Sequence, residues 1–192
     1  MIQSSNRGIN LKMERASIFI DGGYSNRILK SYFATPDIDY EKLSDNICKQ
    51  LQLKRLRTYY YTCMPLRRKG NENDEMKYNN MQRFLTNLRR LPRFEVKLGE
   101  LQMIGGQFRQ KMVDLLMSLD IIDCSSNKQI QHIIILAGDA DFVPAIKRAK
   151  GKGVIVHLFY HPSSVHNQIL DEVDELHVID KELIDKCKKQ LK

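Results

Sequence analysis

Two apolar segments of the sequence each end at aspartates. Residues 16–20 (ASIFI) are followed by Asp21 and two glycines, and residues 133–137 (IIILA) are followed by a glycine and then by Asp139 and Asp141. Short apolar runs that end at glycine are typical of buried strands that end in tight turns. Ligand sites in open α/β sheets form beyond the carboxyl ends of the strands. If these two strands are neighbours, the three carboxylates are therefore expected to share one site.

Carboxylates gathered in one site repel one another and raise one another's pKa. A divalent cation removes this cost, and hard oxygen ligands select Mg²⁺ or Mn²⁺. Such an ion can orient a phosphodiester, lower the pKa of a bound water and stabilise the leaving oxygen. The aspartates therefore predict a metal site suited to phosphodiester hydrolysis.

Two further acids lie in the segment KMVDLLMSLD, which apolar spacing predicts to be a helix. Asp114 is near the start of this helix, where the helix dipole also favours a carboxylate. Asp120 falls on the apolar stripe, where a buried acid needs a partner or a metal. The two residues are about 120° apart on a helical wheel, so the pattern does not give them one shared role.

Each aspartate also has an interpretation that needs no metal. Asp21 could begin a turn before the two glycines, and Asp141 could cap the helix that follows it. Asp114 could be solvated, and Asp120 could pair with a buried Lys or Arg. The hypothesis of a metal site therefore depends on the joint placement of these aspartates and not on any one of them.

Expected strands and helices alternate along the chain. Apolar or β-forming runs predict strands at residues 16–20, 55–62, 94–98, 133–137, 153–160 and 177–179. Helical spacing predicts helices at about 40–52, 81–88, 113–121, 142–151 and 163–176, and residues 66–75 are expected to form a loop. The alternation predicts an α/β fold, a three-layer sandwich with a central, mainly parallel sheet.

The pattern contains no linker and no internal repeat, so one domain is expected over residues 16–181. Residues 1–15 are expected to form a flexible polar tail, and residues 182–192 a basic helix or tail. The right-handed crossover rule predicts that the strand ending at Asp21 adjoins the strand ending before Asp139.

The composition of the chain limits the class of protein and the cellular compartment that we expect. The chain has 192 residues, of which 42% are hydrophobic, and its formal net charge of +8 suits a polyanionic partner. The four cysteines form no CxxC pair, which indicates ordinary thiols in a reducing cytosol. The sequence has no apolar run of about 18 residues and no signal-peptide stretch, so we expect a cytoplasmic protein without membrane contact. The oligomeric state is left open, a homodimer included.

Three blocks of the sequence resemble the signature blocks of NYN-domain proteins of the LabA-like branch. They are FIDGGY at residues 19–24, QKMVDLLMSLD at 110–120 and AGDADFVPAI at 137–146. The segments GKGVIVH and SSVHNQILDEVDEL resemble the closing strand and helix of that family. The similarity covers about residues 16–180, and GDADFVP together with QKMVD is a fairly specific combination.

This resemblance implies a PIN-like sandwich whose acidic pocket supports Mg²⁺- or Mn²⁺-dependent cleavage of RNA. Carried over to this sequence, Asp21, Asp114 and Asp139 would be the acids of the metal pocket. Asp141 and Asp120 would be supporting members. The leading hypothesis is therefore a metal-dependent ribonuclease, and the alternatives are a catalytically weak RNA-binding module and a protein-interaction scaffold.

One position departs from the family pattern. Many members have an asparagine three residues after the first aspartate, where this chain has Tyr24, and Ser25 or Asn26 could take its role. Basic groups could hold RNA phosphates, although the alternative is a solvated face. The residues expected to contact RNA are Arg67, Arg68, Lys69, Lys111 and Asn26.

Overall fold

The computed structural model describes residues 13–34, 37–68, 70–104 and 107–189. Within these ranges the strands are β1 (Arg15–Asp21), β2 (Lys54–Cys63), β3 (Phe94–Ile104), β4 (Gln107–Lys111), β5 (His132–Leu136), β6 (Ile155–Tyr160) and β7 (Glu175–Val178). The helices are α1 (Gly22–Tyr32), α2 (Tyr40–Gln50), α3 (Glu72–Arg89), α4 (Val113–Ser126), α5 (Val143–Lys150), α6 (Asn167–Leu170) and α7 (Lys181–Lys186), with short 3-10 turns η1 (Ala140–Phe142) and η2 (Pro162–Ser164). Most of the expected tail over residues 1–15 lies outside the described residues.

The strands form one sheet in the order β4-β3-β2-β1-β5-β6-β7. Neighbouring strands run parallel except for β3 and β4, which form an antiparallel pair. Strand β1 lies beside β5, with Ile18 opposite Ile134 and Ile20 opposite Leu136. This confirms the prediction that the two aspartate-bearing strands are neighbours. Because the strand order reverses between β1 and β5, their carboxyl ends border the crevice in which open α/β sheets bind ligands.

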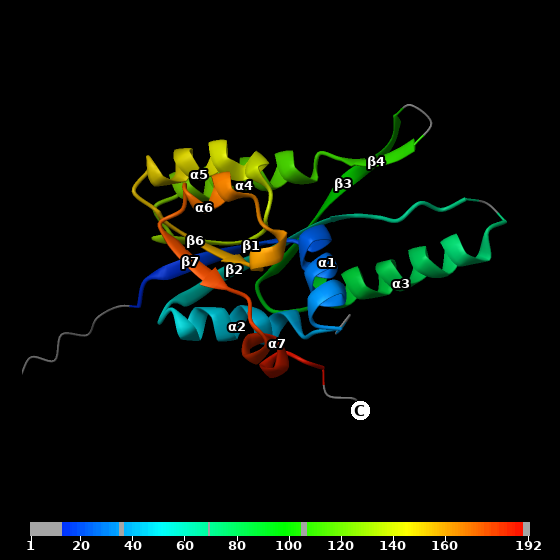
Figure 1. The fold of residues 1–192 in the computed structure, drawn as a ribbon, viewed down its shortest axis with the longest axis horizontal. Coiled ribbons are helices and arrows are strands. Elements are labelled where there is room, and N and C mark those ends of the chain that lie inside the picture. Colours follow the sequence, from blue (N-terminus) through cyan, green and yellow to red (C-terminus); the bar gives the residue numbers. More distant parts are fainter. Residues whose placement is uncertain (1–12, 35–36, 69, 105–106, 190–192) are drawn as a thin grey trace, which may run out of the picture.

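Helices cover both faces of the sheet, with α2 and α7 on one side and α4 and α5 on the other (Figure 1). Ile18 and Ile20 of β1 point into the core formed with α1, α2 and α7. Phe19, between them, points into the core formed with α4 and α5. A strand buried on both faces produces this pattern because successive side chains alternate sides. The fold is therefore the expected α/β sandwich around a mainly parallel sheet.

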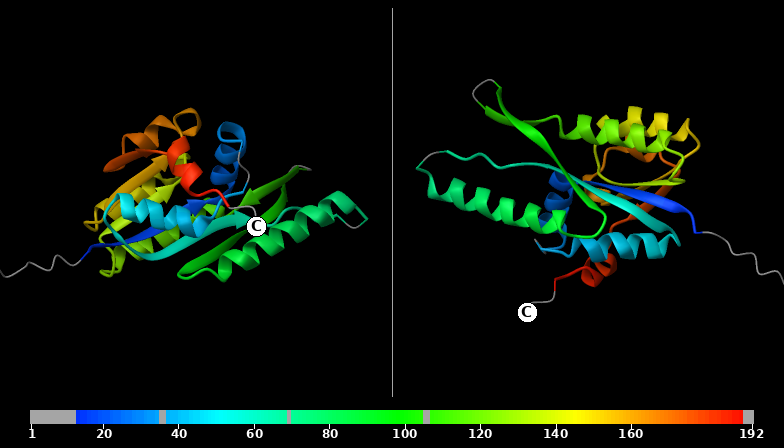
Figure 2. Two further views of the ribbon diagram at one scale, coloured as in Figure 1. Left: turned by 90° about the horizontal axis from the view of Figure 1, so that it is seen from below. Right: turned by 180° about the vertical axis from the view of Figure 1, so that it is seen from behind.

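Two predicted boundaries were wrong near α3 and β3. The helix begins at Glu72, inside the segment expected to be a loop, and the Asn71 side chain caps it by accepting from the Asp74 N–H at 3.1 Å. Polar residues hid this helix because, apart from Asp74, the residues of its first turns are not buried. Strand β3 continues to Ile104 and pairs with β4, which was not predicted. Figure 2 shows α3 and the β3–β4 hairpin extending to the same side of the molecule.

The helix expected over residues 163–176 was also wrong. This segment divides into η2, the single turn α6 and the start of β7 at Glu175. The apolar spacing was misleading because Leu176 belongs to the edge strand β7, opposite Leu158 of β6. The Asp174 carboxylate helps to start this strand by accepting from the Val156 N–H at 2.8 Å.

The four cysteines form no disulfide, and three of them are buried. Each of the four lies within the described residues, so their expected role as ordinary thiols agrees with the structure. In the part of the chain that the structure describes, no helix is long and apolar enough to cross a membrane.

Candidate metal centre

Asp21 is the last residue of β1 and also the residue that caps α1. Its Oδ1 accepts hydrogen bonds from the Gly23 N–H at 2.8 Å and the Tyr24 N–H at 3.1 Å. These bonds fix the carboxylate at the amino end of a helix, where the helix dipole stabilises negative charge. Gly22 is required here because a Cβ at this position would lie 2.7 Å from the buried ring of Tyr60.

Asp139 and Asp141 follow β5 at the same edge of the sheet. The Asp139 carboxylate caps η1 by accepting from the Asp141 N–H at 3.1 Å, and both side chains are exposed to solvent. Gly138 leaves room for a close crossing of chains, because a Cβ there would lie 2.3 Å from the Ser164 carbonyl oxygen and 2.5 Å from the Tyr24 ring. The glycines of both motifs are therefore needed for packing around the aspartates.

Asp114 reaches the same region from a different element. It lies in the first turn of α4, and this helix contacts both β1 and η1. The cap residue of α4, Met112, has a left-handed backbone with φ of 71° and makes no side-chain cap. The Asp114 carboxylate therefore supplies the negative charge that favours this helix end.

The electrostatics of these aspartates join them into one group. Partial burial raises the pKa of Asp114, and the negative charges of Asp21, Asp139 and Asp141 raise it further. Burial likewise raises the pKa of Asp21, and the charge of Asp139 adds to this effect, although the backbone hydrogen bonds and Arg27 oppose it. Asp21, Asp139 and Asp141 thus lie close enough to Asp114 to disfavour its ionisation. We name this set of four the aspartate cluster.

The aspartate cluster fits a hard divalent cation by the chemistry of its donors. It offers only carboxylate oxygens, and three of the four side chains are exposed, so a hydrated ion and a polymeric substrate can reach them. Among the described residues, the group of three ligands whose atoms all lie within 4.8 Å of one another is elsewhere in the molecule. The aspartate cluster is not among the groups of that spacing, so an ion held by it would keep part of its water shell, as Mg²⁺ commonly does.

Asp120 lies apart from this group. Its carboxylate accepts a hydrogen bond from the Tyr61 hydroxyl at 2.7 Å and lies 3.7 Å from Lys97 Nζ. Tyr61 and Lys97 are therefore the partners that this half-buried acid requires. The structure therefore brings Asp120 to β2 and β3 rather than to the other four aspartates.

Tyr24, which replaces the common asparagine, packs at the rim of the aspartate cluster. Its ring lies against Gly138, and its hydroxyl accepts from the His161 N–H at 2.8 Å. Ser25 points into the core, where its hydroxyl is 3.1 Å from that of Tyr40, so it cannot take the asparagine's place at the surface. Asn26 is half-buried on the same helix, near the Tyr60 hydroxyl.

Arg27 is a candidate that sequence reasoning missed. Its guanidinium lies over the Tyr24 ring, 5.5 Å from the centroid, and its charge lowers the pKa of Asp21. The exposed side chain is thus a cation beside the acidic crevice. It could have been found as the residue one helical turn after Tyr24, had α1 been predicted after Asp21.

The basic residues expected to contact RNA lie on other elements. Arg68 pairs with Asp74 in the first turn of α3, and Arg67 lies 3.9 Å from Glu75 and over the Tyr78 ring. Lys69 is outside the described residues. Lys111 ends β4, opposite Glu100 in the hairpin.

Fold and site together define a class of protein, an α/β sandwich with a group of aspartates at the carboxyl ends of its central strands. A family model described as the NYN domain matches residues 15–180. The chain therefore belongs to the NYN-domain family, a PIN-like family whose domains are generally nucleases. Its assignment to the LabA-like branch stays a prediction.

Two known proteins are similar to this chain. An uncharacterized protein of Sinorhizobium fredii, y4oD, is 37% identical over 70 residues, which are 36% of this chain and 32% of that protein. The match thus spans about a third of the relative's length. The crystal structure of a Vibrio parahaemolyticus protein of unknown function covers 94% of this chain and 98% of its own, with a TM-score of 0.60 and 18% identity. At this identity the likeness supports the fold alone.

Proposed function

We propose that this protein is a metal-dependent ribonuclease whose aspartate cluster binds Mg²⁺ or Mn²⁺. The observation that carries the proposal is the convergence of β1, β5 and α4, which places Asp21, Asp139, Asp141 and Asp114 together at one edge of the sheet. The raised pKa of Asp114, to which the three other carboxylates contribute, agrees with this placement. A fold that keeps four acids together at this cost needs a cation to offset their repulsion. Membership of a nuclease family supplies the reaction class.

The chain's own groups prepare the site for this chemistry. Asp21 and Asp139 are each held by backbone N–H groups, so their carboxylates are oriented before any ligand arrives. Asp114 completes the set from α4, and Asp141 lies in the turn beside Asp139. Arg27 adds a positive charge at the edge, where it can contact a phosphate. When bound, a divalent ion supplies an activated water and stabilises the leaving oxygen.

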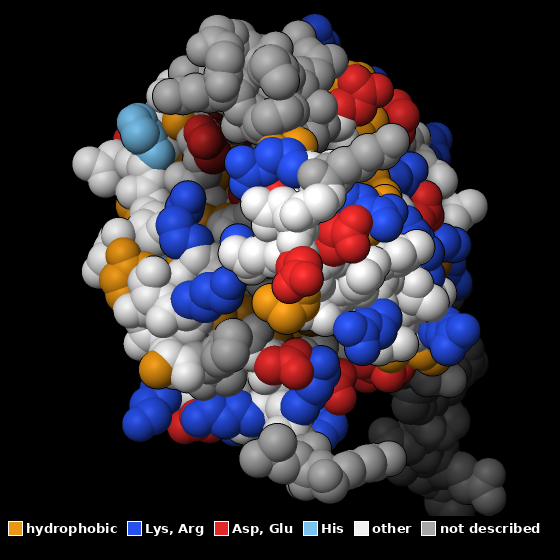
Figure 3. Space-filling model, turned by 90° about the vertical axis from the view of Figure 1, so that its right-hand side faces the viewer, with side chains coloured by type: hydrophobic (Ala, Val, Ile, Leu, Met, Phe, Trp, Pro, Cys, Tyr) orange, Lys and Arg blue, Asp and Glu red, His pale blue; other side chains and the backbone are white. Residues whose placement is uncertain are grey.

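RNA is the substrate that the charge and the family favour. The net charge of +8 suits a polyanion, and the accessible carboxylates suit a polymer rather than an enclosed small molecule. On the face drawn in Figure 3, however, Lys and Arg side chains alternate with Asp and Glu side chains and do not form one continuous basic surface. We therefore assign the main phosphate contacts to a few cations near the crevice, with Arg67, Arg68 and Lys69 as outer contacts.

A second candidate is an RNA-binding module with weak catalysis. The observation that favours it concerns Tyr24, which stands at the position of the common asparagine. Its hydroxyl accepts a hydrogen bond from the His161 N–H. The polar group that the asparagine would offer to the crevice is thus replaced by a packed ring.

One experiment separates these functions. Purified protein is incubated with labelled single-stranded RNA in Mn²⁺, and in parallel with excess EDTA. A ribonuclease cleaves in Mn²⁺ and stops in EDTA, whereas a binding module retains the RNA with salt-dependent affinity and leaves it intact. Neither cleavage nor binding would favour a scaffold.

The outer contacts are tested by changing Arg67, Arg68 and Lys69 together to Ala. If all three hold phosphates, the slope of log affinity against log salt falls by roughly 2 for a single strand. The matched control removes three lysines near the C-terminus, Lys186, Lys188 and Lys189. An unchanged slope in the first variant would show that the arginines stay with Asp74 and Glu75.

A further inference from the structure

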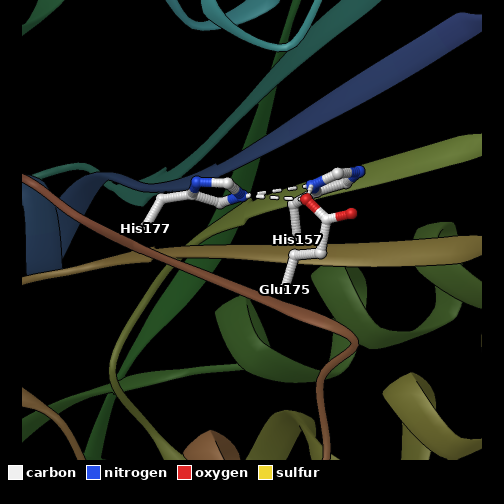
Figure 4. Close-up of side chains that lie close together, drawn as sticks. All are labelled: His157, Glu175 and His177. Carbon is white, nitrogen blue, oxygen red and sulfur yellow. Dashed lines mark hydrogen bonds and ion pairs between the residues drawn. The ribbon is translucent and has the colours of Figure 1, made fainter.

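A second cluster of ligand-type side chains lies away from the aspartates, on strands β6 and β7. His157 Nδ1 is 3.2 Å from His177 Nε2 and 3.1 Å from Glu175 Oε2, and His177 Nε2 is 3.5 Å from the same carboxylate oxygen. Figure 4 shows the three side chains pointing toward one another. Their ligand atoms all lie within 4.8 Å of one another.

The sheet register explains why these residues meet. His157 of β6 pairs directly with Glu175 of β7, and His177 follows two residues later, so all three side chains leave the same face. This face carries α2 and α7, because Ile134 of β5, which pairs with His157, belongs to the core on that side. Glu175 begins β7, so the cluster lies toward the amino ends of the strands. It is therefore separate from the aspartate cluster, which lies at their carboxyl ends.

A chain of hydrogen bonds decides where the protons of this cluster lie. His132 Nε2 is 2.7 Å from the Glu14 carboxylate, and His132 Nδ1 is 2.9 Å from His157 Nε2. When neutral His132 donates to Glu14, its Nδ1 accepts the proton of His157 Nε2. The Nδ1 of His157 then presents a lone pair to the Glu175 carboxylate, which is itself an acceptor. His177 Nε2 can supply a proton to these two acceptors, since it lies 3.2 Å from His157 Nδ1 and 3.5 Å from the carboxylate oxygen. A metal ion bound by all three atoms would take the place of that proton.

The spacing also matches a metal ion. Zinc bonds of about 2.0–2.2 Å in a tetrahedron separate the ligand atoms by about 3.3–3.6 Å, close to the three distances observed. The side chains of His157 and His177 are only 3% and 16% exposed, and a ring nitrogen of each lies within 3.5 Å of the same carboxylate oxygen of Glu175. The ring of His177 is further held by stacking on Phe159, with centroids 4.6 Å apart.

We propose that His157, Glu175 and His177 form a second metal site, selective for a transition ion of the Zn²⁺ class. Two imidazoles and one carboxylate are softer donors than the four carboxylates of the aspartate cluster, so the two sites select different ions. His132 and Glu14 act as the outer partners that orient His157. Because Glu175 is 52% exposed, solvent reaches the cluster and a water completes the tetrahedron. The ion would link the edge strand β7 to β6.

The test measures Zn²⁺ binding by calorimetry on chelator-treated full-length protein in excess Mg²⁺, which occupies the aspartate cluster. We expect one Zn²⁺ per chain and a rise in melting temperature. The variants Glu175→Gln and His177→Asn should each weaken binding at least about 10-fold, because each removes a ligand. The matched control Glu182→Gln changes an exposed carboxylate on α7 that pairs with Lys186, and should bind Zn²⁺ like the wild type.

Two further outcomes are decisive. His132→Gln should weaken Zn²⁺ binding although this residue would not touch the ion, whereas Asp139→Asn should leave it unchanged. The proposal is overturned if the wild type binds no Zn²⁺, or if Glu175→Gln and His177→Asn bind it as tightly as the wild type. Loss of Zn²⁺ binding in Asp139→Asn alone would place the ion in the aspartate cluster and would also overturn it. Circular dichroism of each variant shows that the fold is kept.

Discussion

The Tyr61 hydroxyl donates a 2.7 Å hydrogen bond to the carboxylate of Asp120. Burial and the charge of Asp120 both raise the pKa of Tyr61, so this hydroxyl stays protonated and remains a donor. The bond joins α4 to β2, and Lys97 of β3 approaches the same carboxylate. It explains how an acid on the apolar side of α4 is accommodated without a metal.

Changing Asp120 to Ala should therefore cost stability and spare activity. Loss of a hydrogen bond to a charged group, with the buried Tyr61 hydroxyl left unpaired, should lower the free energy of unfolding by about 1.5–3 kcal/mol. Mn²⁺-dependent cleavage should stay within about twofold of the wild type. Urea unfolding and a cleavage assay measure the two effects, and Tyr61→Phe serves as the partner variant. If the Asp120→Ala protein is stable but inactive, this prediction is wrong and Asp120 belongs to the metal site.

Arg27 should act on both RNA affinity and the pH profile. Replacing it with Gln removes one cation, so the log–log salt slope should fall by about 0.7. Because Arg27 lowers the pKa of Asp21, its loss raises that pKa, and the acid limb of the pH–rate profile should move to higher pH. Lys30→Gln, an exposed change on the same helix, is the control. An unmoved acid limb would show that the charge of Arg27 does not reach the reacting site.

The contribution of Asp114 to stability without metal should fall as pH rises, because the pKa of Asp114 in the folded protein is above its ordinary value of 3.8. The folded state then holds its proton more tightly than the unfolded state, so stability is lost as pH rises from about 4 through the raised value. Asp114→Asn removes this group, and its stability relative to the wild type should increase between about pH 4 and pH 7. Urea melts in EDTA measure this difference. A difference that is constant with pH would remove the argument for charge repulsion.

The central part of the fold could be predicted because its signals are local. Buried runs such as residues 133–137 are apolar on both faces and end at glycine, which led to the correct neighbours β1 and β5. Helix α1 was missed because two glycines, poor helix formers, stand at its start and only the Asp21 cap shows that a helix begins there. The edge strand β7 begins at Glu175, before the predicted start at residue 177, because its exposed residues show no pattern of burial.

The aspartate cluster was accessible to sequence reasoning because its members follow strand ends that the topology brings together. The histidine cluster was not, since His157, Glu175 and His177 meet through the register of β6 against β7. A search for short spacings such as HExxH cannot find ligands that come from neighbouring strands. Ion pairs such as that of Arg68 with Asp74 were likewise hidden, because they depend on where α3 begins.

The most direct test of the account is the rate of Mn²⁺-dependent cleavage of labelled single-stranded RNA by Asp139→Asn. Asparagine keeps the capping of η1, so the fold should be retained. The account predicts a loss of at least about 100-fold, or about 2.7 kcal/mol of transition-state stabilisation. Asp123→Asn, which changes an exposed aspartate on α4, should cleave like the wild type. Full metal-dependent activity in Asp139→Asn would contradict the account, because this aspartate would then be only a turn residue.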